Sequence, residues 1–359
     1  MNEDCLKLTT YFGERDRCGG QFLADRLTEI YASHELQTSV VLRGVQGFGA
    51  KHHLHTDRLL TLSEDLPLVS VAVDTATRIQ AVVAQIERLE FHGLLTLERA
   101  RMLTGQIEPA RLPPELSDGT KLTIYLGRQE RIGRRPAYQA VVDLLHARGL
   151  DGATVMLGVD GTAHGVRQRA RFFGANVQVP LMAVAVGNGD TIASLLPELG
   201  SMLARPLITI ERVRVCKRDG DRLAEPRELP EADASGLQIW QKLMVYTTED
   251  ARYHGRTQYQ ELVYRLRRAS AAGATSLRGI WGYHGDHRPR GDSFWRLRRQ
   301  VPVITVIVDT PERIRQWFEI VDEITGETGT VTSEMVPAYR ATGPDALRIG
   351  GLKLARLGQ

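Results

Sequence analysis

The sequence predicts an α+β protein made of three tandem copies of one unit, each with four strands and two helices. Three observations predict this architecture. Short segments recur three times along the 359 residues, strand-type and helix-type hydrophobic periodicity follow one order within each copy, and segments rich in proline and charge separate the copies. The chain is long enough for three domains with cores of their own.

The copies are recognised from segments that keep their relative positions. Each copy begins with one strand-like segment, repeats a second that ends in glycine, and then has a proline before an apolar run. These are residues 7–11 (KLTTY), 121–125 (KLTIY) and 242–246 (KLMVY); 40–44 (VVLRG), 154–158 (TVMLG) and 275–279 (TSLRG); and Pro67, Pro180 and Pro302. Correspondence over whole units indicates three homologous domains.

The elements follow one another in a fixed order. The first segment alternates between two faces, as a strand does. A helix follows, which in the second copy begins at Pro136 and ends near Gly149. A second strand, a long loop, a third strand, an amphipathic helix and a last strand complete the unit. This β-α-β-β-α-β order is the ferredoxin-like one.

One face of such a sheet is covered by helices, so the other must meet something else. In the first strand we expect that other face to carry Lys7, Thr9 and Tyr11. In the third strand we expect it to carry Leu68, Ser70 and Ala72, then Leu181, Ala183 and Ala185, then Val303, Thr305 and Ile307. A mixed face of this kind suits packing against another sheet, so the three units are predicted to close into an intramolecular pseudo-trimer. The alternative is three separate domains on long linkers.

The predicted boundaries follow from the linkers, which combine proline with charge and lack apolar periodicity. We expect domains at 1–103, 121–216 and 237–339, exposed linkers at 104–120 and 217–236, and a C-terminal appendage at 340–359.

Composition excludes several classes of protein. The chain has 46 Lys and Arg against 43 Asp and Glu, a near balance that disfavours a dedicated nucleic-acid binder. The three cysteines are odd in number and form no CxxC pair, so no disulfide framework is expected. The N-terminus lacks the basic start and apolar run of a signal peptide, and no apolar stretch is long enough for a membrane span. We therefore expect a cytoplasmic protein.

Two stretches carry a family resemblance. Residues 121–161 of the second copy and 42–74 of the first resemble the domain-of-unknown-function 190 family of the PII-like superfamily, and the resemblance extends to all three copies. It implies a trimeric ferredoxin-like fold in which the loop after the second strand corresponds to the partner-contacting T-loop of PII signalling proteins. It also implies effector binding, usually of adenine nucleotides, in clefts between neighbouring units.

The candidate ligand residues lie in two recurring places. Arginines precede the first helix of each copy, where helix N–H groups and guanidinium groups favour phosphate, although a solvated basic turn has the same pattern. Glycines follow the second strand, where they suit either an anion-binding nest or a simple bend. The expected residues are Arg17, Arg43, Gly44, Gly47, Arg131, Arg135, Gly158, Gly161, Arg252, Arg256, Gly279 and Gly282.

The long loops differ among the copies, and we expect them to contact a protein, since aromatic and arginine side chains often anchor interfaces. The expected partner residues are His55, Arg58, Arg169, Phe172, Arg290 and Trp295. His52, His53 and His55 are close in sequence, but a mobile loop offers no fixed geometry, so no metal site is expected.

Catalytic motifs are not found in the sequence. Glu98, Glu211 and Glu334 recur on the last strand, and we expect them to pair with basic neighbours at an interface rather than to act as general bases. We therefore expect a non-enzymatic PII-like regulator with no required cofactor, whose effector is a small anion, foremost an adenine nucleotide. The alternative is a ligand-free adaptor for a membrane transporter, a channel or another cytosolic partner.

Overall fold

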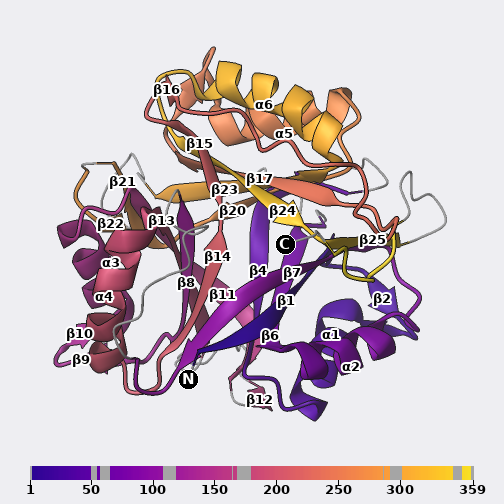
Figure 1. The fold of residues 1–359 in the computed structure, drawn as a ribbon, viewed down its shortest axis with the longest axis horizontal. Helices are drawn as coiled ribbons and strands as arrows, with labels where there is room; N and C mark the ends of the chain where they lie inside the picture. The colour runs from indigo at the N-terminus through magenta and orange to yellow at the C-terminus, as the bar shows by residue number, and fades with distance from the viewer. Residues whose placement is uncertain are drawn as a thin grey trace.

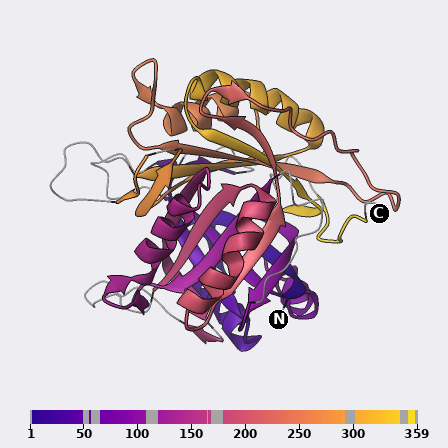
Figure 2. The ribbon, with the colours of Figure 1, turned by 60° about the vertical axis from the view of Figure 1, so that its left-hand side comes forward.

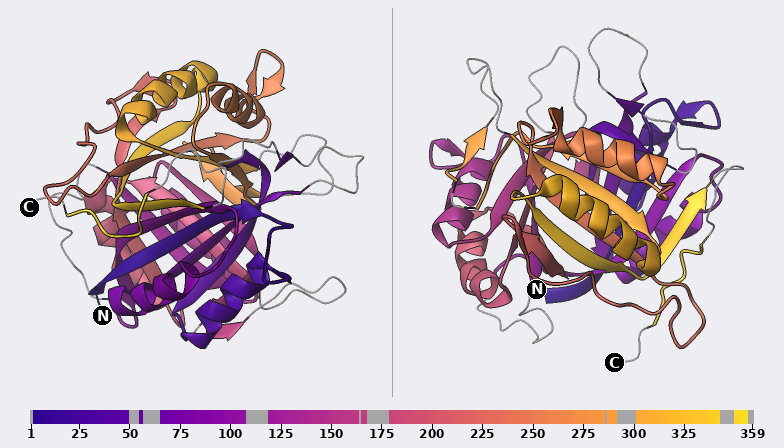
Figure 3. Two further views of the ribbon diagram at one scale, coloured as in Figure 1. Left: turned by 90° about the vertical axis from the view of Figure 1, so that its right-hand side faces the viewer. Right: turned by 90° about the horizontal axis from the view of Figure 1, so that it is seen from above.

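The computed structural model describes residues 2–49, 55–56, 65–107, 119–163, 165–167, 179–285, 287–291, 301–342 and 350–356. Three repeats surround a common centre, with strands inside and a pair of helices outside each repeat (Figure 1). Figure 2 brings helices α3 (Ala137–Ala147) and α4 (Gly189–Met202) of the second repeat forward. Viewed from above, α5 (Gln258–Arg268) and α6 (Pro311–Thr325) lie side by side across the strands of the third repeat (Figure 3).

Every repeat has the order strand, helix, strand, strand, helix, strand. The first has β1 (Asn2–Gly13), α1 (Leu23–Ser33), β4 (Thr38–Phe48), β6 (Pro67–Thr75), α2 (Ala76–Ile86) and β7 (Gly93–Thr104). The second has β8 (Thr120–Gly127), α3, β11 (Gly152–Ala163), β13 (Pro180–Gly187), α4 and β14 (Leu207–Arg212). The third has β17 (Trp240–Thr248), α5, β20 (Ala274–Arg278) with β21 (Trp281–His284), β23 (Pro302–Asp309), α6 and β24 (Thr330–Val336).

Shorter strands supplement this frame. A hairpin of two strands, each two residues long, precedes the first helix of each repeat. A short strand follows the second main strand, and further short strands follow the last main strand of the second and third repeats. These are β2 (Arg17–Cys18) with β3 (Gln21–Phe22), β9 (Arg131–Ile132) with β10 (Arg135–Pro136), β18 (Arg252–Tyr253) with β19 (Arg256–Thr257), β5 (His55–Thr56), β12 (Val166–Arg167), β22 (Arg290–Gly291), β15 (Arg214–Arg218), β16 (Asp221–Arg222) and β25 (Ala338–Thr342).

Within each repeat the strands are antiparallel in the spatial order second, third, first, last. In the first repeat β6 lies between β4 and β1, and β7 pairs with the other side of β1. The same order holds for β11, β13, β8 and β14, and for β20, β23, β17 and β24.

Neighbouring repeats complete each other's sheets at both edges. The second strands meet in a closed cycle, because β4 pairs with β11 along one half and with β20 along the other, and β11 pairs with β21. The last strands form a second cycle, in which β7 pairs with β14, β15 with β24, and β25 with β7. Both outer strands of each four-stranded sheet are therefore covered along part of their length, which protects their backbone groups.

The helices form where the sequence places apolar residues at helical spacing. In α2 the buried stripe is Ile79, Val82, Val83 and Ile86. At the start of α4 the side chain of Asn188 accepts a hydrogen bond from the backbone N–H of Asp190 at 2.8 Å, and α6 has proline at its first position. In the part of the chain that the structure describes, no helix combines the length and apolarity needed to cross a membrane.

Three apolar cores lie between the helices and the sheets, and a fourth fills the centre. The sequence-based assignment of the third strand to the central face is wrong. Val69, Val71 and Val73 face the centre, whereas Leu68 and Ala72 pack under the helices. The same holds in the second copy, where Leu181, Ala183 and Ala185 lie on the helix side, and for Ile307 in the third.

The pairing register explains this correction. Lys7, Thr9 and Tyr11 lie directly opposite Val73, Val71 and Val69, and directly opposite residues share a face. A shift of one residue in the assignment moves every side chain to the other face. Residues on both faces of β6 are buried. The number of apolar residues on each face therefore does not show which face is central.

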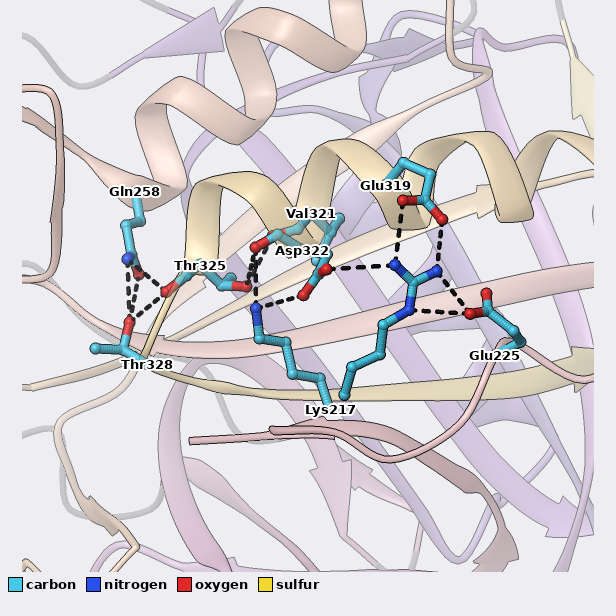
Figure 4. A network of polar contacts seen from close by, with 9 residues as sticks. Lys217, Glu225, Gln258, Glu319, Val321, Asp322, Thr325 and Thr328 are labelled. Carbon is cyan, nitrogen blue, oxygen red and sulfur yellow. Dashed lines mark hydrogen bonds and ion pairs between the residues drawn. The ribbon is translucent and has the colours of Figure 1, made fainter. Parts of the chain in front are cut away.

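The sequence indicated an exposed connection at residues 217–236. The structure differs at the start of this linker. Its first residue, Lys217, belongs to β15 and is 2% exposed. The Lys217 ammonium donates to the Asp322 carbonyl at 2.9 Å and carboxylate at 2.5 Å, on helix α6 (Figure 4). The C-terminal segment is also integrated, because Ala355 is buried and its carbonyl accepts a bond from Arg99 at 2.5 Å. Residues 108–118 of the first linker lie outside the described part.

Glycines permit the close approach of the second strands at the junctions between repeats. A Cβ atom at Gly161 would lie 2.2 Å from the Ser39 carbonyl oxygen of the first repeat, and one at Gly282 would lie 2.1 Å from the Ala153 carbonyl oxygen of the second. The ring of a proline, Pro180 or Pro302, lies within 3 Å of the same Cβ positions. Any side chain there would force the strands apart.

Substitution of Gly161 by alanine is expected to lower the free energy of unfolding by about 1–3 kcal/mol, the usual range for overpacking a close contact. Urea unfolding followed by circular dichroism measures the change. Gly49→Ala is the matched control, because a Cβ atom at Gly49 would have no neighbour within 4 Å among the described residues. Equal stability of the two variants would contradict the proposed role of Gly161.

Candidate functional site

The centre of the molecule holds a ring of six buried charges. The first strand of each repeat supplies a lysine and the last strand a glutamate, and each is at most 7% exposed. Each ammonium contacts the carboxylate of its own repeat and the carboxylate of one neighbour. The contacts are Lys7 with Glu98 (3.2 Å) and Glu211, Lys121 with Glu211 (3.2 Å) and Glu334, and Lys242 with Glu334 (2.9 Å) and Glu98 (2.5 Å).

The strand register produces this alternation. Lys7 lies directly opposite Glu98 in the pairing of β1 with β7, and the same opposition recurs in the other two repeats. The expectation that the recurring glutamates pair with basic neighbours at an interface is therefore confirmed. The partners are the lysines of the first strands, which the sequence placed on this face without assigning them to the glutamates.

The ring lowers the pKa values of Glu98 and Glu334. Burial alone would raise the pKa of Glu98, but the ammonium groups of Lys242 and Lys7 outweigh it and hold the pKa well below its usual range. The pKa of Glu334 is likewise lowered, because Lys121 and Lys242 outweigh its burial. These carboxylates therefore stay charged in the folded protein.

The three carboxylates bring oxygen atoms within 4.8 Å of one another, a spacing that a metal ion could use. The three ammonium groups already balance their charge, so we assign no metal to this centre. Next to the ring is a cavity of about 50 Å³, lined by the three lysines, by Tyr11 and Tyr125, and mostly by apolar side chains of all three repeats.

A second site is a cleft of about 20 Å³ at the junction of the second and third repeats. It is lined by Asp151, Gly152, Ala153, Thr154 and Val186 of the second repeat and by Tyr246, Thr247, Tyr283, His284, Pro302 and Thr330 of the third. The start of β11 pairs here with β21, the strand that leads toward the third long loop. The cleft is therefore built from both repeats.

An arginine–aspartate ion pair and a histidine–aspartate contact border this cleft. His284 Nε2 lies 2.6 Å from a carboxylate oxygen of Asp219, and Arg218 donates to Asp151 at 2.6 Å. Burial raises the pKa of Asp151, although the Arg218 guanidinium acts in the opposite direction. Arg218 and Asp219 come from β15 and the turn after it, so the last-strand extension of the second repeat carries both partners to the cleft.

The predicted arginines lie outside the cleft: Arg43 is in β4, and the others are on the hairpins before the helices. Arg17 donates to the Gly20 carbonyl at 2.7 Å and Arg131 to the Arg134 carbonyl at 3.1 Å. The others pair with nearby carboxylates or are exposed. Arg43 contacts Glu14 at 2.8 Å, Arg135 contacts Asp143 at 2.5 Å, Arg256 contacts Glu261 at 3.2 Å, and Arg252 is exposed.

The predicted glycines lie together at the three junctions. Gly44 and Gly47 approach Pro67 and the backbone of β20, and Gly158 and Gly161 approach Pro180 and the first repeat. Gly279 and Gly282 approach Pro302 and the second repeat. Their contacts explain the bend and the close strand approach, while ligand binding through their N–H groups stays a prediction.

The predicted partner residues lie in the long loops, and only His55 and Arg290 belong to the described part of the chain. Arg58, Arg169, Phe172 and Trp295 lie outside the described residues. The backbone of His55 belongs to β5 and pairs with Gly47, and Arg290 is exposed in β22.

Sequence reasoning missed the cleft residues Asp151, Asp219 and His284. His284 could have been noticed in the sequence, because the equivalent residues of the other two copies are Gly49 and Ala163. This difference becomes visible only when the three copies are aligned residue by residue. Asp219 lay in a segment interpreted as a linker.

Comparison with known proteins follows the same division of the chain. The family profile of DUF190, described as "Uncharacterized ACR", matches residues 5–102, 119–215 and 240–338. The chain belongs to the DUF190 family. The predicted three tandem copies are thereby confirmed, and each match spans the six main elements of one repeat.

A curated relative has the length of one repeat. The UPF0166 protein of Aquifex aeolicus (strain VF5) is 34% identical over 95 residues, which make up 26% of this chain and 88% of the relative. This DUF190 chain thus contains three units of a size that also occurs singly.

Replacing Lys242 by methionine should lower the free energy of unfolding by about 3–5 kcal/mol, because Glu98 and Glu334 would each lose a buried partner. The double variant Lys242→Met/Glu98→Gln restores neutrality and should be more stable than the single variant. Urea unfolding of both variants checks this order. A cost below about 1 kcal/mol for the single variant would show that the ring is not electrostatically coupled.

The lowered pKa values of Glu98 and Glu334 predict a response to acid. Their contribution to stability is present above the unfolded-state pKa, near 4.3, and is lost as pH falls through the lower folded-state pKa. Between pH 5 and 3 the wild type should therefore lose more stability than the Lys242→Met/Glu98→Gln variant. Parallel urea titrations across that range measure both slopes, and identical slopes would contradict the prediction.

Proposed function

We propose that this DUF190 protein is a PII-like regulator, an intramolecular pseudo-trimer of ferredoxin-like modules that binds a small anionic effector, foremost an adenine nucleotide. Its effector lies between repeats, and its long loops contact a protein target. The activity is binding rather than catalysis, with no required cofactor, in the cytoplasm. The family membership supports the class of protein, and the cleft between the second and third repeats carries the proposal.

The position of the cleft suits signalling to a loop. His284 lines it at the end of β21, the strand that precedes β22 and the third long loop. A ligand in the cleft would contact the strand from which this loop departs. Ordering of a loop by a ligand changes the surface offered to a partner, and this is an established route of regulation.

The hairpins before the helices are suited to the phosphates of the effector. Exposed Arg252 and Arg256 follow β17, and Tyr246 and Thr247 near the end of that strand line the cleft. The N–H groups at the start of α5 add to their positive potential. A nucleotide with its base in the cleft would direct its phosphates outward toward such groups.

The loops support a protein target. Their sequences place Phe172 and Trp295 among arginines. Aromatic and arginine side chains together are typical of residues that anchor protein interfaces. A membrane transporter or channel is the partner class that we propose first.

Calorimetric titration with ATP, ADP, AMP and cyclic AMP, with and without magnesium, tests the proposal. We expect binding of at least one nucleotide, and at least tenfold weaker binding by the variant Arg17→Glu/Arg131→Glu/Arg252→Glu, because charge-assisted bonds to phosphate are worth about 1.5–3 kcal/mol each. The control Arg88→Glu/Arg205→Glu/Arg212→Glu changes the net charge equally at other exposed arginines and should bind normally. Absence of both heat and thermal stabilisation with all four nucleotides would overturn the proposal.

A further inference from the structure

The three junctions between repeats share one backbone plan, so their side chains can be compared position by position. Where the second strands of two repeats cross, Tyr283 lies opposite Ala153, Thr162 opposite Ser39, and Phe48 opposite Ala274. The residue after each of these is His284, Ala163 or Gly49. The three clefts are thus equivalent in position and different in chemistry.

The junction of the third and first repeats is apolar. Phe48 is 3% exposed and packs into the helix-side core of the third repeat. Gly49 follows it with no side chain, and Leu94 lies opposite Tyr11 on the central face. The side chains of Phe48 and Leu94 offer no hydrogen bond to a ligand.

At the junction of the first and second repeats, the polar groups of the paired second strands bond to one another. The hydroxyl groups of Ser39 and Thr162 are 2.9 Å apart. Arg167 of β12 joins the repeats, because its guanidinium contacts both Asp25 of α1 and Asp160 at 2.5 Å. This junction is closed by its own contacts.

The junction of the second and third repeats differs at Thr330. This residue lies opposite Tyr246 and lines the cleft, and it takes the position that leucine holds in the other repeats, Leu94 in the first and Leu207 in the second. Thr330 is 3% exposed, and its hydroxyl has no hydrogen-bond partner among the described residues. A buried hydroxyl without a partner costs about 1–3 kcal/mol, and a ligand could remove that cost.

Each carboxylate beside this cleft has a partner in the protein, because Asp151 accepts from Arg218 and Asp219 contacts His284. A Cβ atom at Gly152 would lie 3.6 Å from His284 Nδ1, so this second ring nitrogen faces the strand that forms the cleft wall. A hydroxyl and an imidazole beside Tyr246 and Pro302 suit a flat, uncharged group that both donates and accepts hydrogen bonds.

We propose that the cleft between the second and third repeats is the one base-recognition site of this chain, in which Thr330 and His284 contact an uncharged nucleobase. The inference rests on the proposed function and adds that one of the three equivalent clefts is used. The cleft of about 20 Å³ must widen to admit a base, and the third long loop begins beside it. One nucleoside should therefore bind per chain.

Calorimetric titration of the full chain with adenosine, which has a base but no phosphate, tests this site. We expect one site per chain and at least tenfold weaker binding by Thr330→Val, which removes the hydroxyl at nearly constant volume. Thr330→Ser retains the hydroxyl and should restore affinity to within about threefold. The matched control is Thr332→Val, since Thr332 is also buried on β24 but does not line the cleft. Its affinity should equal that of the wild type.

The outcomes separate the two proposals. Three equivalent adenosine sites, or equal affinity of Thr330→Val and the wild type, would overturn the single-site inference and leave the nucleotide-binding function intact. Binding of ATP without binding of adenosine would overturn base recognition alone. Failure of adenosine and of all four nucleotides to bind would overturn both proposals.

Discussion

The buried ring of three lysines and three glutamates is the constraint on which the arrangement of the repeats depends. Apolar contacts around the centre stabilise the association without direction, whereas the ring is satisfied only when each ammonium meets one carboxylate of its own repeat and one of a neighbour. Buried ion pairs add little net stability but are costly to break. We therefore assign the ring a role in fixing the rotational order of the repeats, which in turn places the second strands where they can pair across the junctions.

Much of this architecture could be predicted from the sequence, because it depends on local periodicity and on recurrence. The strands, the helices and the pairing of Glu98 with a basic neighbour follow from features that recur in all three copies. The face of the third strand could not be assigned reliably, because Ser70 and Val71 are both buried and alternation separates two faces without saying which is central. The central face holds Val69, Val71 and Val73, whereas the helix face mixes large and small residues, with Leu68 beside Ala72.

The candidate site was less predictable for a different physical reason. A glycine that allows a bend and a glycine that binds an anion have the same sequence pattern, and only the distance from Gly161 to the Ser39 carbonyl shows that close strand approach is required there. His284 and Asp219 come together because β15 crosses onto the third repeat, a pairing between segments that sequence periodicity does not encode. The residues that distinguish one cleft from the others therefore depart from the repeat pattern, whereas the residues that build the ring obey it.

The pairing of β25 with β7 has a consequence for synthesis of the chain. The third repeat is followed by β25, which covers residues 93–97 of β7 in the first, so this part of the edge has no partner until the third repeat has been synthesised. Linear arrays of repeats can fold one unit after another, but a closed circuit of strands gains its final contacts only at the end. Nascent chains of this protein therefore expose part of a strand edge until the third repeat is made, a period in which such edges favour aggregation and in which chaperones act.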